Sequence, residues 1–165
     1  LKSKYPVLTV FFEKMRTGNG SMEKYNSKSI LAKTIAQSKG INDILVSLRD
    51  EDFDKDTNSV LKRIDINFAK TEKGGAWSDL GASVGRMAAR LKVIKHGDYY
   101  DVRLLGFDRS NYEYKEDASD ISNKWIRWAN NFFYDLQQQG LITPFSFEVT
   151  SNFYFNKSNG KVYTK

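Results

Sequence analysis

Two runs of alternating apolar and polar residues, separated by His96-Gly97-Asp98, constrain the fold of this chain more than any other feature. In residues 86–93 and again in residues 100–104, apolar side chains occur at every second position. A period of two is typical of a strand with one buried and one solvated face. Because glycine readily adopts tight-turn conformations, these runs predict two antiparallel strands joined by a turn at Gly97.

Helical spacing of apolar residues predicts three helices earlier in the chain. The first starts in the serine-rich residues 27–29 and ends at Gly40, and the second covers residues 41–48. An acidic loop separates these from a third helix, which Thr57 or Asn58 would cap. The third helix is expected to turn four apolar residues inward: Val60, Leu61, Ile64 and Phe68.

A long amphipathic helix is predicted to start near Ser119 or Asp120 and to end at Gly140. Its apolar stripe, at steps of four, three, four and four residues, consists of Ile121, Trp125, Trp128, Phe132 and Leu136. The tryptophans could stack on nucleic-acid bases or contact a membrane surface, but their helical spacing favours burial in the core. Alternation in residues 145–155 then predicts a strand, which residues 157–162 turn into a short final one.

The predicted architecture is α+β, with N-terminal helices followed by an antiparallel sheet packed on the long aromatic helix. A length of 165 residues suits a single domain covering residues 1–165. Within it, a helical part (1–73) precedes a strand-rich part that includes the long helix (76–165). The Gly74-Gly75 pair marks an internal loop between the two parts.

Composition excludes several kinds of site. The chain has no cysteine and one histidine, which rules out disulfides and the common zinc ligand sets. A magnesium or calcium site made of carboxylates stays open, but no metal ligands are identified and no cofactor is predicted. No apolar run is long enough for a membrane-spanning helix. The net charge of +6 favours an anionic target, either nucleic acid or a lipid surface, although no run of five basic residues occurs.

Residues around the predicted hairpin are the candidates for chemistry. The predicted catalytic residues are His96, Asp101, Asp108 and Arg109, and the predicted substrate-binding residues are Arg86, Arg90, Arg103, Trp77 and Asp79. Histidine suits acid–base work at neutral pH, so His96 could act as a general acid or base, with Asp98 or Asp101 to orient it. If the hairpin pairs as expected, Asp101 and Arg103 share a polar face with the basic residues of the preceding strand and could bind a phosphate or carboxylate. A solvated turn and an ordinary charge-paired sheet surface are the alternative interpretations of these residues.

Four motifs follow one another in a recognisable order: FFEKMRTGNG, AWSDLG, HGDYYDVRLL and NKWIRWANNFFYDLQQQGLITPFSFEV. Their order resembles that of an uncharacterised enterobacterial domain-of-unknown-function family, and the resemblance spans most of the chain. The chain has Asp79-Leu80 where relatives tend to carry a histidine, and residues 106–109 replace an acid-His-Phe-Gly run. Roles of those histidines are therefore not carried over. The resemblance implies a toxin or effector of bacterial competition.

The leading functional hypothesis is a toxin-like effector domain that is secreted or delivered into a target cell. The expected partners are a cognate immunity protein and the anionic target. The start at Leu1 rather than Met suggests that the domain is cut from a longer exported protein. A nuclease or nucleic-acid-binding domain that uses the basic sheet face is the alternative. A non-enzymatic protein-interaction module is a further alternative, so the sequence leaves open whether the chain is an enzyme.

Overall fold

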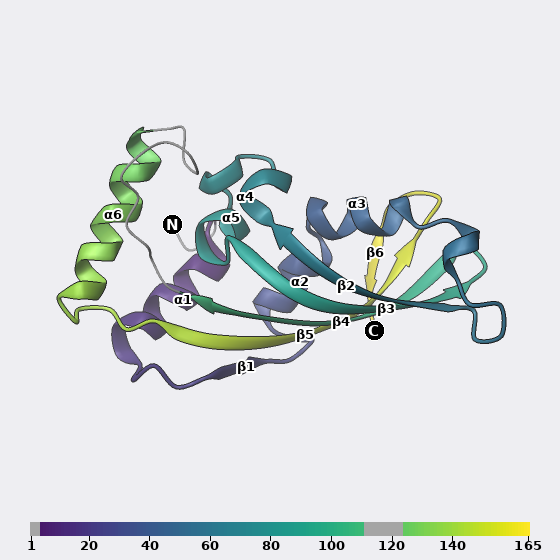
Figure 1. Cartoon of the computed structure of the whole chain (residues 1–165), viewed down its shortest axis with the longest axis horizontal. Coiled ribbons are helices and arrows are strands. Elements are labelled where there is room, and N and C mark those ends of the chain that lie inside the picture. The colour runs from purple at the N-terminus through teal and green to yellow at the C-terminus, as the bar shows by residue number, and fades with distance from the viewer. Residues whose placement is uncertain (1–3, 111–123) are drawn as a thin grey trace.

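The computed structural model describes residues 4–110 and 124–165 and has an α+β fold (Figure 1). One mixed sheet runs in the order β1-β5-β4-β3-β2, with β6 also paired to β5. The strands are β1 (Glu23–Tyr25), β2 (Ser59–Asn67), β3 (Arg86–His96), β4 (Tyr99–Ser110), β5 (Phe145–Asn156) and β6 (Val162–Thr164). The described α-helices are α1 (Pro6–Thr17), α2 (Ile30–Ala36), α3 (Lys39–Ser47), α4 (Phe68–Thr71), α5 (Asp79–Ser83) and α6 (Lys124–Gln138). β1 is parallel to β5, and the other strand pairs are antiparallel.

The hydrophobic core lies between one face of the sheet and the helices. On α1, the ring of Phe11 lies 5.2 Å from that of Phe145 and 5.1 Å from that of Phe147 on β5. On α2, the backbone oxygen of Ala32 accepts a 2.8 Å hydrogen bond from the Ser151 hydroxyl of β5. Figure 1 shows the described helices on this side of the strands or at the end of the sheet, and none of them covers the other side. The sheet therefore has a buried core face and an open face.

The predicted hairpin is confirmed. β3 and β4 pair antiparallel up to His96 and Tyr99, and Gly97 in the turn has a φ of 61°. The strand predicted at residues 145–155 is β5, and the short final strand is β6. Strict alternation identified β3, β4 and β5 because their core-face residues are buried along most of each strand.

The helix predicted after Asn58 is wrong, because this segment is strand β2. All nine of its residues pair with β3, which buries Ile66 and leaves Leu61 75% exposed. Asn58 turns the chain into the strand with a φ of 54°. The β-branched residues of this segment suit a strand, and long-range pairing overrides the helical spacing. The part predicted to be helical (1–73) therefore contains both β1 and β2.

Gly40 does not end the first predicted helix. α2 ends at Ala36, and Gly40 lies inside the next helix, α3. A Cβ at this position would lie 2.8 Å from Thr71 Oγ1 and 3.0 Å from Ile66 Cγ2. The glycine is therefore required by the close packing of α3 on β2 and α4, and the predicted helix at residues 41–48 is confirmed with a slightly earlier start.

The aromatic helix α6 is placed differently from the prediction. Its expected start and Ile121 lie outside the described residues, as does the side chain of Trp125. Trp128 is 63% exposed and Phe132 is 47% exposed, so their assignment to the core is wrong. The helix reaches the core through Phe133 and Leu136, and the Phe133 ring contacts Phe12 of α1 at 5.8 Å. In Figure 1, α6 stands beside α1 at one end of the sheet. The core face is covered by α1, α2 and α3, which contribute the buried residues Phe11, Ile35 and Leu45.

Candidate functional site

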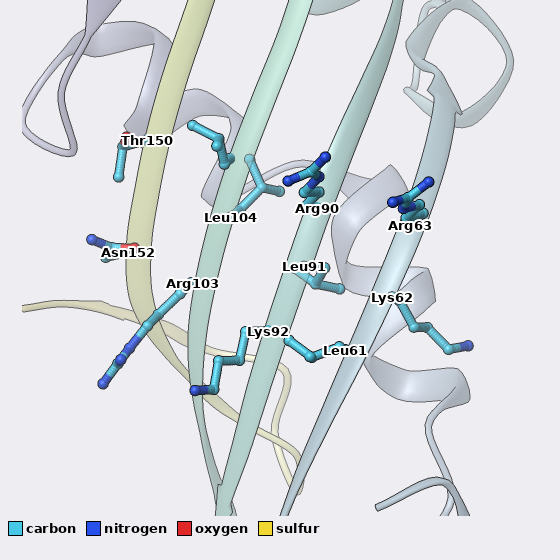
Figure 2. A pocket seen from close by; sticks show the side chains of 11 residues that line it. Leu61, Lys62, Arg63, Arg90, Leu91, Lys92, Arg103, Leu104, Thr150 and Asn152 are labelled. Atoms are coloured by element: carbon cyan, nitrogen blue, oxygen red, sulfur yellow. The ribbon is translucent and has the colours of Figure 1, made fainter.

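The open face carries the side chains that alternate with the core residues along the strands. Near its centre are four exposed basic residues, referred to below as the basic cluster: Arg63, Arg90, Lys92 and Arg103. Figure 2 shows them on the three adjacent strands β2, β3 and β4. The structure thus brings together Arg90 and Arg103, which the sequence predicted. Arg63 was missed because β2 was taken for a helix.

Like charges face each other within the basic cluster. Arg63 lies opposite Arg90 across β2 and β3, and Lys92 lies opposite Arg103 across β3 and β4. Like charges in directly opposed positions destabilise a sheet. The side chains of Arg63, Arg90 and Lys92 have no hydrogen-bond or ion-pair partner among the described residues. A bound anion would relieve this repulsion.

A shallow hollow of about 600 Å³ lies over the basic cluster. Besides the cluster it is lined by Leu61, Lys62, Leu91, Leu104, Leu105, Thr150 and Asn152. Thr150 and Asn152 continue the two cross-strand rows of the cluster onto β5, opposite Leu105 and Arg103. The hollow therefore combines cationic groups with neutral hydrogen-bonding groups and apolar surface.

Four aromatic rings lie on the open face, on either side of the basic cluster along the strands. Tyr99 and Phe107 of β4, Tyr154 of β5 and Tyr163 of β6 are 39–45% exposed. The rings of Tyr99 and Tyr163 lie 6.2 Å apart. In the sequence, each of these aromatic residues occupies a position that alternation assigns to the polar face of its strand. This position is the signal that could have identified them. Exposed rings beside cations are suited to stacking on flat aromatic ligands.

Asp101 is the one buried carboxylate of the open face in the described residues. It accepts a hydrogen bond from Lys165 Nζ and lies 3.5 Å from Arg103 Nη2. Burial raises the pKa of this carboxyl, but the hydrogen bond and charge of Lys165, with Arg103, outweigh burial and lower the pKa below its usual value. Asp101 is thus held as a paired anion and neutralises part of the positive charge near Tyr154.

The predicted catalytic residues His96 and Asp108 and the predicted substrate-binding residue Arg86 lie at separate places on the sheet. His96 and Arg86 are exposed on the open face at opposite ends of β3. Asp108 lies in register with Phe147, which places it on the core face, away from Asp101. The side chain of Arg109 lies outside the described residues.

The two candidates before β3 lie apart from the basic cluster. Trp77 is half-exposed in the short turn between α4 and α5. The Asp79 carboxylate accepts hydrogen bonds from the backbone N–H groups of Val7 and Leu8, each at 2.9 Å. Asp79 therefore caps the N-terminus of α1 from another helix, which is a structural role.

Acidic side chains and histidine do not form a metal-binding group in the described part of the chain, where no three of them lie close enough to hold an ion. In the same residues, no helix is long and apolar enough to cross a membrane.

Comparison of the chain with protein-family models, with curated proteins and with solved structures gave no match.

Proposed function

We propose that the open face binds single-stranded nucleic acid. The observation that carries this proposal is the opposition of like charges, Arg63 to Arg90 and Lys92 to Arg103, on a face flanked by exposed aromatic rings. Phosphate groups are the ligand feature that neutralises such a cluster, and unpaired bases are the feature that stacks on the rings.

The spacing of the cations suits a phosphate chain. Arg90 and Lys92 are two residues apart on one strand, which corresponds to about 6.8 Å. Arg103 and Arg63 lie on the neighbouring strands, so the positive charge crosses the sheet as well as following β3. An extended polyanion lying over these strands contacts several cations at once, whereas a single small anion uses only one pair.

A single strand fits this surface better than a duplex does. The rings of Tyr99, Phe107 and Tyr154 can stack only on bases that are not already stacked and paired. The surface is a sheet face and presents no helix to a major groove. A lipid surface also offers phosphates but no flat rings to stack on Tyr99 and Phe107.

Binding of fluorescent oligonucleotides, followed by anisotropy over a salt series, tests the proposal. Single strands should bind at least tenfold more tightly than a duplex of the same sequence. Three or four phosphate contacts should give a slope of about −2 to −3 for log K against log salt. Arg90→Ala and Phe107→Ala should each weaken binding, and Lys55→Ala in an exposed loop is the matched control.

Two results would argue against this function. Equal affinity for vesicles of anionic lipid and for oligonucleotides would show charge attraction alone. Binding that does not change with salt would show that phosphates are not contacted. The toxin-like effector function and the expected secretion stay predictions, and expression of the chain inside bacteria, with and without an export signal, tests them.

A further inference from the structure

β2 forms an edge of the sheet that no other described strand pairs with. It stands last in the strand order and pairs only with β3 among the described strands. Its central residues 61–63 are exposed, and so is Asp65. An edge of nine residues is long, and its free backbone groups form a template for another strand.

The backbone groups on the free edge belong to the odd-numbered residues of β2. Lys95 N–H donates to the Asn58 carbonyl at 2.9 Å, so Asn58 points toward β3. The Ser59 carbonyl points the other way and accepts from Asp54 N–H at 2.8 Å. Continued alternation turns the backbone groups of Leu61, Arg63, Asp65 and Asn67 outward.

We propose that β2 pairs antiparallel with β2 of a second copy of this chain, around a twofold axis at Ile64. In this register, Arg63 of each copy lies opposite Asp65 of the other, and Leu61 lies opposite Asn67. Arg63 and Asp65 have no ion-pair partner among the described residues of one copy. Pairing therefore joins their opposite charges twice, which is the self-complementarity that a twofold interface requires.

Charge also selects this register over its neighbours. The two nearest registers that still join outward-facing groups place Arg63 opposite Arg63, or Asp65 opposite Asp65. Both oppose like charges, which destabilises the pairing. The charges on this edge therefore disfavour the neighbouring registers. They are complementary to those of a second copy in one register only.

The pairing would join the open faces of the two copies on one side of a continuous sheet. The twofold axis is perpendicular to the plane of the joined sheet, so the two basic clusters lie on the same face of that sheet. This inference rests on the β2 edge, and because Arg63 belongs both to this edge and to the basic cluster, it is tested without a ligand.

Sedimentation velocity of the full chain without ligand, over a wide range of protein concentrations, tests the proposal. A concentration-dependent species of twice the chain mass is expected. Arg63→Asp and Asp65→Arg should each raise the dimer dissociation constant at least tenfold, because each creates like-charge oppositions. The double variant Arg63→Asp with Asp65→Arg should restore it to within about threefold, since the opposite charges are exchanged.

Lys62→Glu is the matched control. Lys62 directly precedes Arg63 on the same strand but projects to the other side of the sheet, opposite Ile66 of the second copy, and its reversal should leave dimerisation within about threefold. Circular dichroism verifies that each variant is folded. A chain that stays monomeric at high concentration, or a double variant no better than the single ones, would overturn the proposal.

Discussion

Arg63 of β2 and Arg90 of β3 lie directly opposite each other on the open face, and neither side chain has a partner among the described residues. A pair of this kind weakens the sheet, and the proposed binding of nucleic acid would offset this repulsion. This separates the basic cluster from an ordinary surface, where opposite charges alternate. Stability and binding should respond in opposite directions when the pair is removed.

Arg90→Thr should stabilise the protein and weaken nucleic-acid binding. Removing the repulsion, with threonine's good fit to a strand, should raise the free energy of unfolding by up to about 1 kcal/mol. Loss of one phosphate contact should reduce the salt slope by about 0.7. Urea unfolding and anisotropy measure the two effects, and Lys55→Thr should show neither. A destabilised Arg90→Thr protein would contradict the argument.

Asp79→Ala should destabilise the protein without affecting the open face. Its carboxylate binds the free N–H groups of Val7 and Leu8 at the start of α1. Loss of such a cap costs about 1–2 kcal/mol in the free energy of unfolding. Asp79→Asn keeps a hydrogen-bond acceptor and should lose less. Both variants should keep the wild-type affinity for oligonucleotides. A drop in affinity without a loss of stability would assign Asp79 a binding role instead.

Asp101→Asn should remove a pH-dependent part of the stability. Because the pKa of Asp101 is lowered in the folded protein, its carboxyl binds protons more readily when the protein is unfolded. The stabilisation is therefore complete well above the ordinary value of 3.8 and is lost as the pH falls through the lower folded pKa. The variant should be roughly 1–3 kcal/mol less stable at neutral pH. Urea titrations from neutral to strongly acidic pH should show the wild type and the variant converging.

Tyr100→Phe should leave stability unchanged or raise it by up to about 1 kcal/mol. The Tyr100 hydroxyl is buried and has no hydrogen-bond partner among the described residues. A buried hydroxyl without a partner carries a desolvation penalty that phenylalanine avoids. Thermal unfolding measures the effect, with the exposed Tyr99→Phe as the control. A loss of more than about 1 kcal/mol would indicate that the hydroxyl makes a bond through a buried water.

Alternation was enough to predict β3, β4 and β5, because each of these strands has one buried face along most of its length. The turn at Gly97 was also predicted from the local sequence, because the positive φ of this turn favours glycine. From these strands the sequence also placed Arg90, Asp101 and Arg103 on one face. It did not predict Arg63, because the apolar residues of β2 have helical spacing.

The sequence by itself determined the α+β class and the hairpin that carries most of the basic cluster, because local alternation and a single glycine specify them. Only the tertiary structure decided three other features. Pairing with β3 made residues 59–67 a strand and set Arg63 opposite Arg90. Packing against α1 left Trp128 in solvent, and Lys165 reached Asp101 across 64 residues of sequence. Such contacts join distant segments, and their energies exceed the weak local preferences that a sequence pattern expresses.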